Sequence, residues 1–180
     1  MLFVIASLVI TSLAQAQLFV GKETTIHFLS KSSLEDIEAK NTVPKPILDA
    51  TSGDIQIRIP NKQFKFKSSV MEEHFNENYM ETEKYPNTTF KGKINEKVDY
   101  TKDGENKVTC TGTLDMHGVT QTITINGTIT VKGNQLTVVS KFIVKLVDYK
   151  IKVPSLYIKN IAEEIAVDIN SVMEPYTSKK

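Results

Sequence analysis

The sequence predicts an all-β protein, an antiparallel β-barrel with one short helix packed at the barrel. Apolar and polar residues alternate with a period of two along most of the chain, as in strands that bury one face. Tight-turn signals such as Gly133-Asn134 separate these runs. No regular alternation of strands and helices occurs, which disfavours a parallel sheet. Closing about eight to ten strands into a barrel removes the exposed sheet edges, so a barrel is the expected architecture.

The strands before the helix come from short alternating runs. Ile55, Ile57 and Ile59 fall on one face of such a run, and Phe64 and Phe66 share a face of the next, with lysines opposite. The runs expected as strands in this part of the chain are 25–30, 34–39, 54–59 and 63–67.

One helix is expected between these strands and the rest, from Ser69 to about Tyr79. Ser69 and Glu72 have the spacing of a capping box at a helix start. Tyr85-Pro86 prevents any continuation, because a residue before proline is pushed out of the helical region. We expect this helix to pack against one end of the barrel through an apolar edge, and His74 to brace the junction. The residues on that edge, four apart, are Met71, Phe75 and Tyr79.

The strands after the helix are longer and are joined mainly by turns. Asp103-Gly104, His117-Gly118 and Gly133-Asn134 are the expected hairpin turns. Pro154 and the run 156–158 are expected to form a connection before the last strand. The expected strands are 88–93, 98–102, 107–115, 119–131, 136–146 and 165–172.

Composition excludes several classes of protein. The 180 residues, 40% of them hydrophobic, suit one globular domain with a sizeable core. A net charge of +1 argues against nucleic-acid binding, which needs a basic excess. Cys110 is the single cysteine, so no intrachain disulfide forms, and its place in an alternating run favours a buried apolar role over a nucleophile.

Residues 1–16 have the features of a signal peptide, which leaves 17–180 as the barrel domain. The segment is uncharged and apolar, and Ala14-Gln15-Ala16 matches a cleavage pattern, with the cut before Gln17. A transmembrane anchor is the alternative, but Ser and Thr interrupt the run and it falls short of about 20 apolar residues. The usual positive residues at the start are missing, and a start codon upstream would account for this.

Catalytic and metal-binding patterns are absent from the sequence. His27, His74 and His117 do not have metal-ligand spacing, so no metal site is expected. The glutamates of the helix region are better explained as a solvated face than as a glycosidase pair. One enzymatic alternative stays open, in which His74 and His117 meet in space with a helix carboxylate such as Glu73.

The interior of a barrel of this size is either filled by side chains or leaves room for one apolar ligand. A cavity would make the protein a binding module, and a solid interior would suit a structural or stress-response protein. Periodicity alone does not separate these alternatives. The candidate inward residues are Phe64, Phe66, Phe90, Leu114, Met116, Ile123, Ile125, Val138, Phe142 and Val144.

A set of motifs occurs in a characteristic order. Glu73-His74 is followed by the stretch 83–86, reading EKYP, by Thr89-Phe90, and by 112–120, reading GTLDMHGVT. With LVDYKIKVPS at 146–155, these segments resemble the YceI-like family of exported proteins. The likeness extends from about Thr24 to Val172 and rests on the combination of motifs.

The resemblance implies a lipocalin-like barrel with an apolar interior that binds a polyisoprenoid lipid, such as an isoprenoid quinone or its precursor. It implies a periplasmic location, cofactor-free binding and no catalytic residues, so we expect a binding protein and not an enzyme. Carriage, storage and protection of the lipid all stay open, and so do a monomer and a homodimer. The lipid-binding residues expected are the ten inward candidates together with Phe75 and Tyr79 of the helix.

Overall fold

The computed structural model describes residues 17–31, 36–152 and 162–177. The expected signal peptide, the start of the predicted strand 34–39 and the connection at Pro154 and 156–158 lie outside the described residues. The strands are β1 (Leu18–Ser30), β2 (Ile37–Asn41), β3 (Ile47–Asp49), β4 (Asp54–Pro60), β5 (Lys65–Phe66), β6 (Asn87–Ile94), β7 (Gly104–Met116), β8 (Val119–Lys132), β9 (Gln135–Lys145) and β10 (Glu164–Pro175). The helical segments are η1 (Asn61–Gln63), α1 (Ser69–His74), the π-helical turn η2 (Phe75–Tyr79) and η3 (Leu146–Tyr149).

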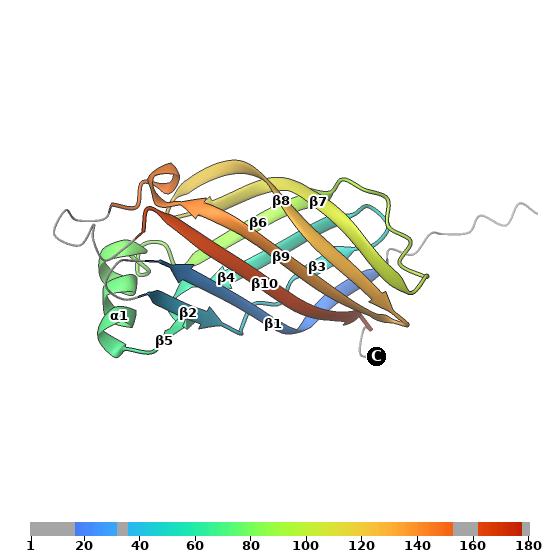
Figure 1. Cartoon of the computed structure of the whole chain (residues 1–180), viewed down its shortest axis with the longest axis horizontal. Coiled ribbons are helices and arrows are strands. Elements are labelled where there is room, and N and C mark those ends of the chain that lie inside the picture. The colour runs from blue at the N-terminus through green and yellow to red at the C-terminus, as the bar shows by residue number, and fades with distance from the viewer. Residues whose placement is uncertain (1–16, 32–35, 153–161, 178–180) are drawn as a thin grey trace, which may run out of the picture.

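Among the described residues, eight strands close into an antiparallel barrel, as predicted. The closed circuit runs β1, β10, β9, β8, β7, β6, β4, β3 and back to β1. The pairing of β1 with β10, from Phe19 to Leu29, closes the circuit. The strands wind obliquely around a long barrel, with α1 at one end and the turn between β8 and β9 at the other (Figure 1).

At the helix end, β2 and β5 widen the wall. The first residues of β1 pair with β3, whereas Ile26 to Ser30 pair with β2, which in turn pairs with β5. A register shift between Gly21 and Glu23 separates the two halves of β1. A side chain at Gly21 would clash with Pro46, because its Cβ would lie 2.5 Å from the proline ring. The backbone of β1 therefore approaches Pro46 closely at the point where its pairing with β10 shifts register.

The barrel has a packed end and a helix end. At the packed end, Phe19, Leu48, Leu136 and Met173 are at most 1% exposed. Tyr100, from the loop after β6, places its ring 6.2 Å from that of Phe19, and burial raises the pKa of Tyr100 to about 12. A second core cluster surrounds the helix end.

Two local predictions are wrong. No strand covers 98–102 and no hairpin forms at Asp103-Gly104, because this segment is a loop that places Val98 and Tyr100 on the packed end. Asp103 instead accepts a hydrogen bond from the Gly133 amide, at 2.7 Å. The turns at His117-Gly118 and Gly133-Asn134 form as expected.

The predicted capping box is also wrong. Ser68, not Ser69, caps the helix, and its side chain makes no capping hydrogen bond. The Glu72 carboxylate instead accepts a hydrogen bond from Lys65 Nζ at 2.6 Å and a long one from the Phe66 amide at 3.4 Å. The helix start is therefore fixed to β5 by contacts that the local sequence does not encode.

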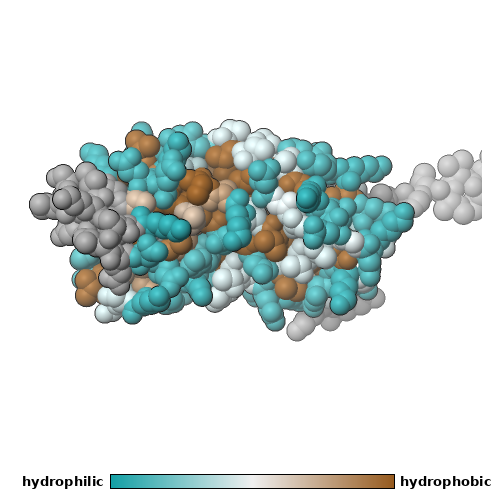
Figure 2. All heavy atoms as spheres, viewed as in Figure 1, coloured by the Kyte–Doolittle hydropathy of each residue, from teal (hydrophilic) through white to brown (hydrophobic). Residues whose placement is uncertain are grey.

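The face of the barrel drawn in Figure 2 is mostly hydrophilic. Figure 2 shows hydrophilic side chains over much of one face, with hydrophobic atoms in separate patches between them. None of the helices within residues 17–31, 36–152 and 162–177 is long and apolar enough to cross a membrane.

A row of charged side chains crosses the seam of the barrel, where β1 pairs with β10 on one side and with β2 on the other. His27 of β1 lies 3.1 Å from Glu38 of β2 and 3.5 Å from Asp168 of β10. Lys67 and Lys141 extend the row on either side, at 2.6 Å from Glu38 and 2.9 Å from Asp168. Hydrogen bonds from Lys67 and His27 lower the pKa of Glu38, and those from Lys141 and His27 lower the pKa of Asp168.

The seam should weaken in acid. A carboxyl group whose pKa is lowered by folding stabilises the native state above its unfolded pKa and loses that contribution as pH falls through its folded pKa. We therefore expect the free energy of unfolding to decrease as the pH drops below 4.5, the ordinary pKa of a glutamate carboxyl. This decrease should be less steep in the double variant Glu38→Gln, Asp168→Asn. Urea unfolding across pH tests this, with the exposed Glu174→Gln as control. An unchanged slope in the double variant would contradict the prediction.

Candidate functional site

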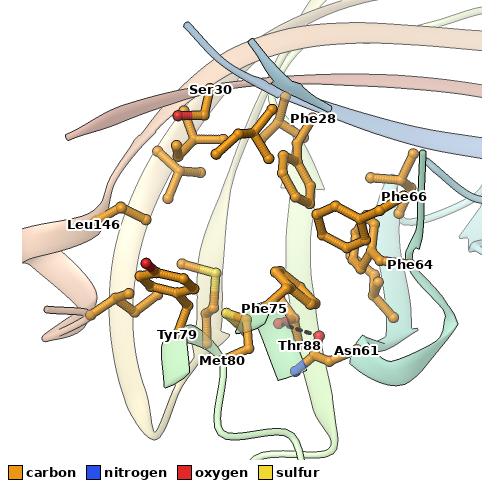
Figure 3. A pocket seen from close by; sticks show the side chains of 18 of the residues that line it. Phe28, Ser30, Asn61, Phe64, Phe66, Phe75, Tyr79, Met80, Thr88 and Leu146 are labelled. Atoms are coloured by element: carbon orange, nitrogen blue, oxygen red, sulfur yellow. Dashed lines mark hydrogen bonds between the residues drawn. The ribbon is translucent and has the colours of Figure 1, made fainter. Parts of the chain in front are cut away.

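The helix end of the barrel encloses a cavity of about 490 Å³. This volume lies within the range of about 300–1,000 Å³ that is typical of small-molecule sites. Its walls come from β1, β4, β6, β7, β9 and β10, and α1 and η2 cover part of it. Side chains from these elements surround the open space in Figure 3. The barrel is therefore not filled solid in this half.

The cavity wall is almost entirely apolar, and the buried polar groups on it are already hydrogen-bonded. Asn61 donates to the Tyr85 carbonyl at 2.8 Å and accepts from Thr88 Oγ1 at 3.0 Å, a bond drawn in Figure 3. Ser30 Oγ accepts from the Ala162 amide at 2.9 Å. Throughout the described residues, no buried side-chain nitrogen or oxygen lacks a partner. Such a wall favours an apolar ligand, since a polar one would lose its hydration without compensation.

Four phenylalanine rings form one side of the cavity. Phe28 of β1, Phe64, Phe66 of β5 and Phe75 of η2 form five ring pairs whose centroids are 5.1–5.7 Å apart. Figure 3 shows these rings together, with Tyr79 and Leu146 across the opening. Aromatic contacts of this kind stabilise the fold beyond what the burial of each ring contributes. The cluster joins three segments of the chain and anchors the helix to the barrel.

The π-helical turn places the last part of the helix over the cavity. The Met80 amide donates to the Phe75 carbonyl at 2.8 Å, a five-residue step that widens the turn. Asn76 donates to the Glu72 carbonyl at 2.8 Å and so stabilises the same turn. Phe75 and Tyr79 both line the cavity from this turn, as expected from their spacing.

The structure brings most of the predicted lipid-binding residues together. Phe90, Ile125 and Val138 line a separate, deeper cavity of about 70 Å³. Ile123 lines neither cavity and packs against the core cluster of the helix end. The predicted residues that line the larger cavity are Phe64, Phe66, Phe75, Tyr79, Leu114, Met116, Phe142 and Val144.

Sequence reasoning missed the wall formed by β1 and β10. Ile26 and Phe28 of β1 line the cavity, as do Ile165, Val167 and Ile169 of β10. Both strands were predicted and both alternate, so the signal was present. The sequence does not show that these two distant strands are neighbours, and so their inward faces could not be assigned to the same cavity.

The histidines do not form a catalytic pair in the described part of the chain. His74 is exposed and lines the cavity, which His117 does not. His117 instead contacts the Tyr149 carbonyl through Nδ1 at 3.0 Å and Glu81 through Nε2 at 2.8 Å, and its ring packs on Tyr85. The expectation that His74 braces the helix junction is therefore corrected, because His117 does so.

No chemistry is evident at the remaining candidates among the described residues. No group of three or more histidine, cysteine or acidic side chains there could hold a metal ion. Cys110 is buried, and burial, with a smaller effect of the Glu96 charge, raises the pKa of its thiol to about 11. A thiol with such a pKa is a poor nucleophile at neutral pH.

Comparison with known proteins gives matches to one family and to several solved structures. A family model described as a YceI-like domain matches residues 13–173. A polyisoprenoid binding domain from Saccharophagus degradans, implicated in plant cell wall breakdown, is 17% identical with a TM-score of 0.76, over 90% of this chain and 100% of that chain. BcnA from Burkholderia cenocepacia is 18% identical with a TM-score of 0.71, over 83% of this chain and 95% of that chain.

The YceI protein of Campylobacter jejuni is 18% identical with a TM-score of 0.58, over 98% of this chain and 92% of that chain. No curated protein sequence matches significantly. At these identities the solved structures establish the fold that the chain shares with them, a closed antiparallel barrel.

Replacing Phe75 by Ala should loosen the helix end. A fully buried phenylalanine would cost about 3–5 kcal/mol, but Phe75 is only half-buried, so we expect a loss of about 1–3 kcal/mol in the free energy of unfolding. Chemical denaturation measures this change. Val70→Ala is the matched control, since Val70 is 55% exposed on the same helix and should change stability by less than about 0.5 kcal/mol. Equal effects of the two variants would show that Phe75 does not anchor the helix.

Proposed function

The chain belongs to the YceI-like domain family, and we propose that it binds a polyisoprenoid or another long-chain apolar lipid in the cavity at the helix end. The observation that carries the proposal is an apolar cavity of about 490 Å³ whose buried polar groups are already hydrogen-bonded. The polyisoprenoid binding domain from Saccharophagus degradans shares the fold and supports this class of ligand.

Burial of the lipid chain supplies the affinity. Each methylene transferred from water to an apolar wall contributes about 0.8 kcal/mol. The four-phenylalanine side of the cavity offers flat apolar surfaces that suit the branched methyl groups of an isoprenoid chain. An isoprenoid quinone or its precursor is the more specific candidate, because its chain has this chemistry and its ring would stay near the opening.

We favour binding over catalysis. A catalytic site would need a positioned acid, base or nucleophile beside the bound substrate. The exposed His74 borders the cavity, but His117 is engaged with Glu81 and the Tyr149 carbonyl at the junction. The protein would then carry, store or protect its lipid without changing it, as a monomer or as a homodimer.

Lipid binding is tested with the purified full chain. Organic-solvent extraction followed by mass spectrometry should recover a polyisoprenoid or related lipid, and titration with an isoprenoid quinone should displace an apolar fluorescent probe. Val167→Trp, which places a large ring in the cavity, should lower the bound fraction by at least about tenfold. Ala166→Trp places the same ring on the outer face of β10 and is the matched control. Recovery of no lipid, together with no quinone binding, would sink the proposal.

Export to the periplasm is proposed on the basis of residues 1–16. Their uncharged apolar run and the Ala14-Gln15-Ala16 pattern favour cleavage before Gln17. Cell fractionation should place the protein in the periplasmic fraction, and N-terminal sequencing should begin at Gln17. Ala16→Arg blocks the small-residue position and should leave an uncleaved precursor. A cytoplasmic protein that retains residues 1–16 would contradict this proposal.

A further inference from the structure

The two interior cavities follow one another along the barrel. On β6, Thr88 lines the larger cavity and Phe90 lines the deeper one. On β9, Phe142 lines the larger cavity and Ser140 the deeper one, and β4 and β7 keep the same order. Ile169 of β10 lines both. On each of these strands the larger cavity therefore lies nearer the helix end and the deeper one nearer the packed end.

A layer of buried apolar side chains occupies the boundary between the two cavities. Strand pairing places Ile57, Phe90 and Leu114 side by side on β4, β6 and β7. On the other wall, Ile26 of β1 pairs with Ile169 of β10. Four of the five are between 2% and 7% exposed, and Ile169 packs against them. The layer separates a cavity of about 490 Å³ from one of about 70 Å³.

Phe90 is the largest side chain of this layer, and its position depends on a glycine. A Cβ added at Gly92 would lie 2.6 Å from Phe90 Cζ and 2.8 Å from Cys110 Sγ. The Phe90 ring therefore lies over Gly92, where no side chain occupies the inward face of β6. The ring points along the strand toward the packed end, which keeps the larger cavity open above it.

We propose that this layer is the floor of the lipid cavity, and that Phe90, held over Gly92, sets the longest chain that the cavity buries fully. The inference rests on the proposed lipid-binding function and adds a determinant of chain length to it. A chain long enough to touch the layer fills the cavity. Any additional carbons of a longer chain stay outside the cavity and add no burial.

The test is a series of polyprenols of increasing length, measured by displacement of an apolar fluorescent probe from the full chain. In the wild type, affinity should rise by about fourfold for each methylene buried, and should level off at one chain length. Phe90→Ala should move this break to longer chains, because it opens the floor toward the deeper cavity. Gly92→Ala should move it to shorter chains, because the added methyl group displaces the Phe90 ring toward the larger free volume.

Leu136→Ala is the matched control. Leu136 is fully buried at the packed end and lines neither cavity, so this variant should weaken the fold without moving the break. If Phe90→Ala does not fold, Phe90→Leu serves in its place and should move the break in the same direction. A break that stays at the wild-type length in both folded Phe90 and Gly92 variants would overturn the inference. A wild-type protein that binds no polyprenol of any length would instead overturn the proposed function.

Discussion

The pairing of β1 with β10 is the interaction on which the rest of the structure depends. It joins the first and last described strands over ten paired positions, from Phe19 with Pro175 to Leu29 with Ala166. Without it the sheet would have two open edges, and the inward faces of its strands would have no opposite wall. Closure also brings Ile26 and Phe28 next to Val167 and Ile169, so the same pairing that removes the edges builds one side of the cavity.

The two halves of the barrel divide stability and binding between them. A cavity costs stability, since its lining side chains lose packing contacts. The packed end offsets this with fully buried side chains such as Leu48, Leu136 and Met173. The helix end can then keep an unfilled volume, with four phenylalanine rings holding the wall and the helix in place.

The sequence predicts the fold more reliably than the site, and particular residues show why. Alternation identified most strands, but it failed at the start of β1, where the register shift between Gly21 and Glu23 breaks the period of two. The loop residues Val98 and Tyr100 were mistaken for a strand because they are apolar for a tertiary reason, their contact with the packed end. His117 could not be identified as the brace, since Glu81 and Tyr149 are 36 and 32 residues away along the chain. Eight of the twelve predicted lipid-binding residues line the larger cavity. The other four lie outside it, and alternation could not separate them from the eight because their depth in the barrel depends on strand register.

The closed floor of the cavity has a consequence for the route by which a lipid enters and leaves. A barrel open along its whole length would let a lipid enter at one end and leave at the other. Here the layer of Ile26, Ile57, Phe90, Leu114 and Ile169 and the packed core beyond it block that route. A lipid that enters tail first must back out head first, so delivery and collection use the same opening and occur one after the other. Whether the protein carries, stores or protects its lipid, uptake and release would then take place through one opening, and the barrel would not serve as a through-channel.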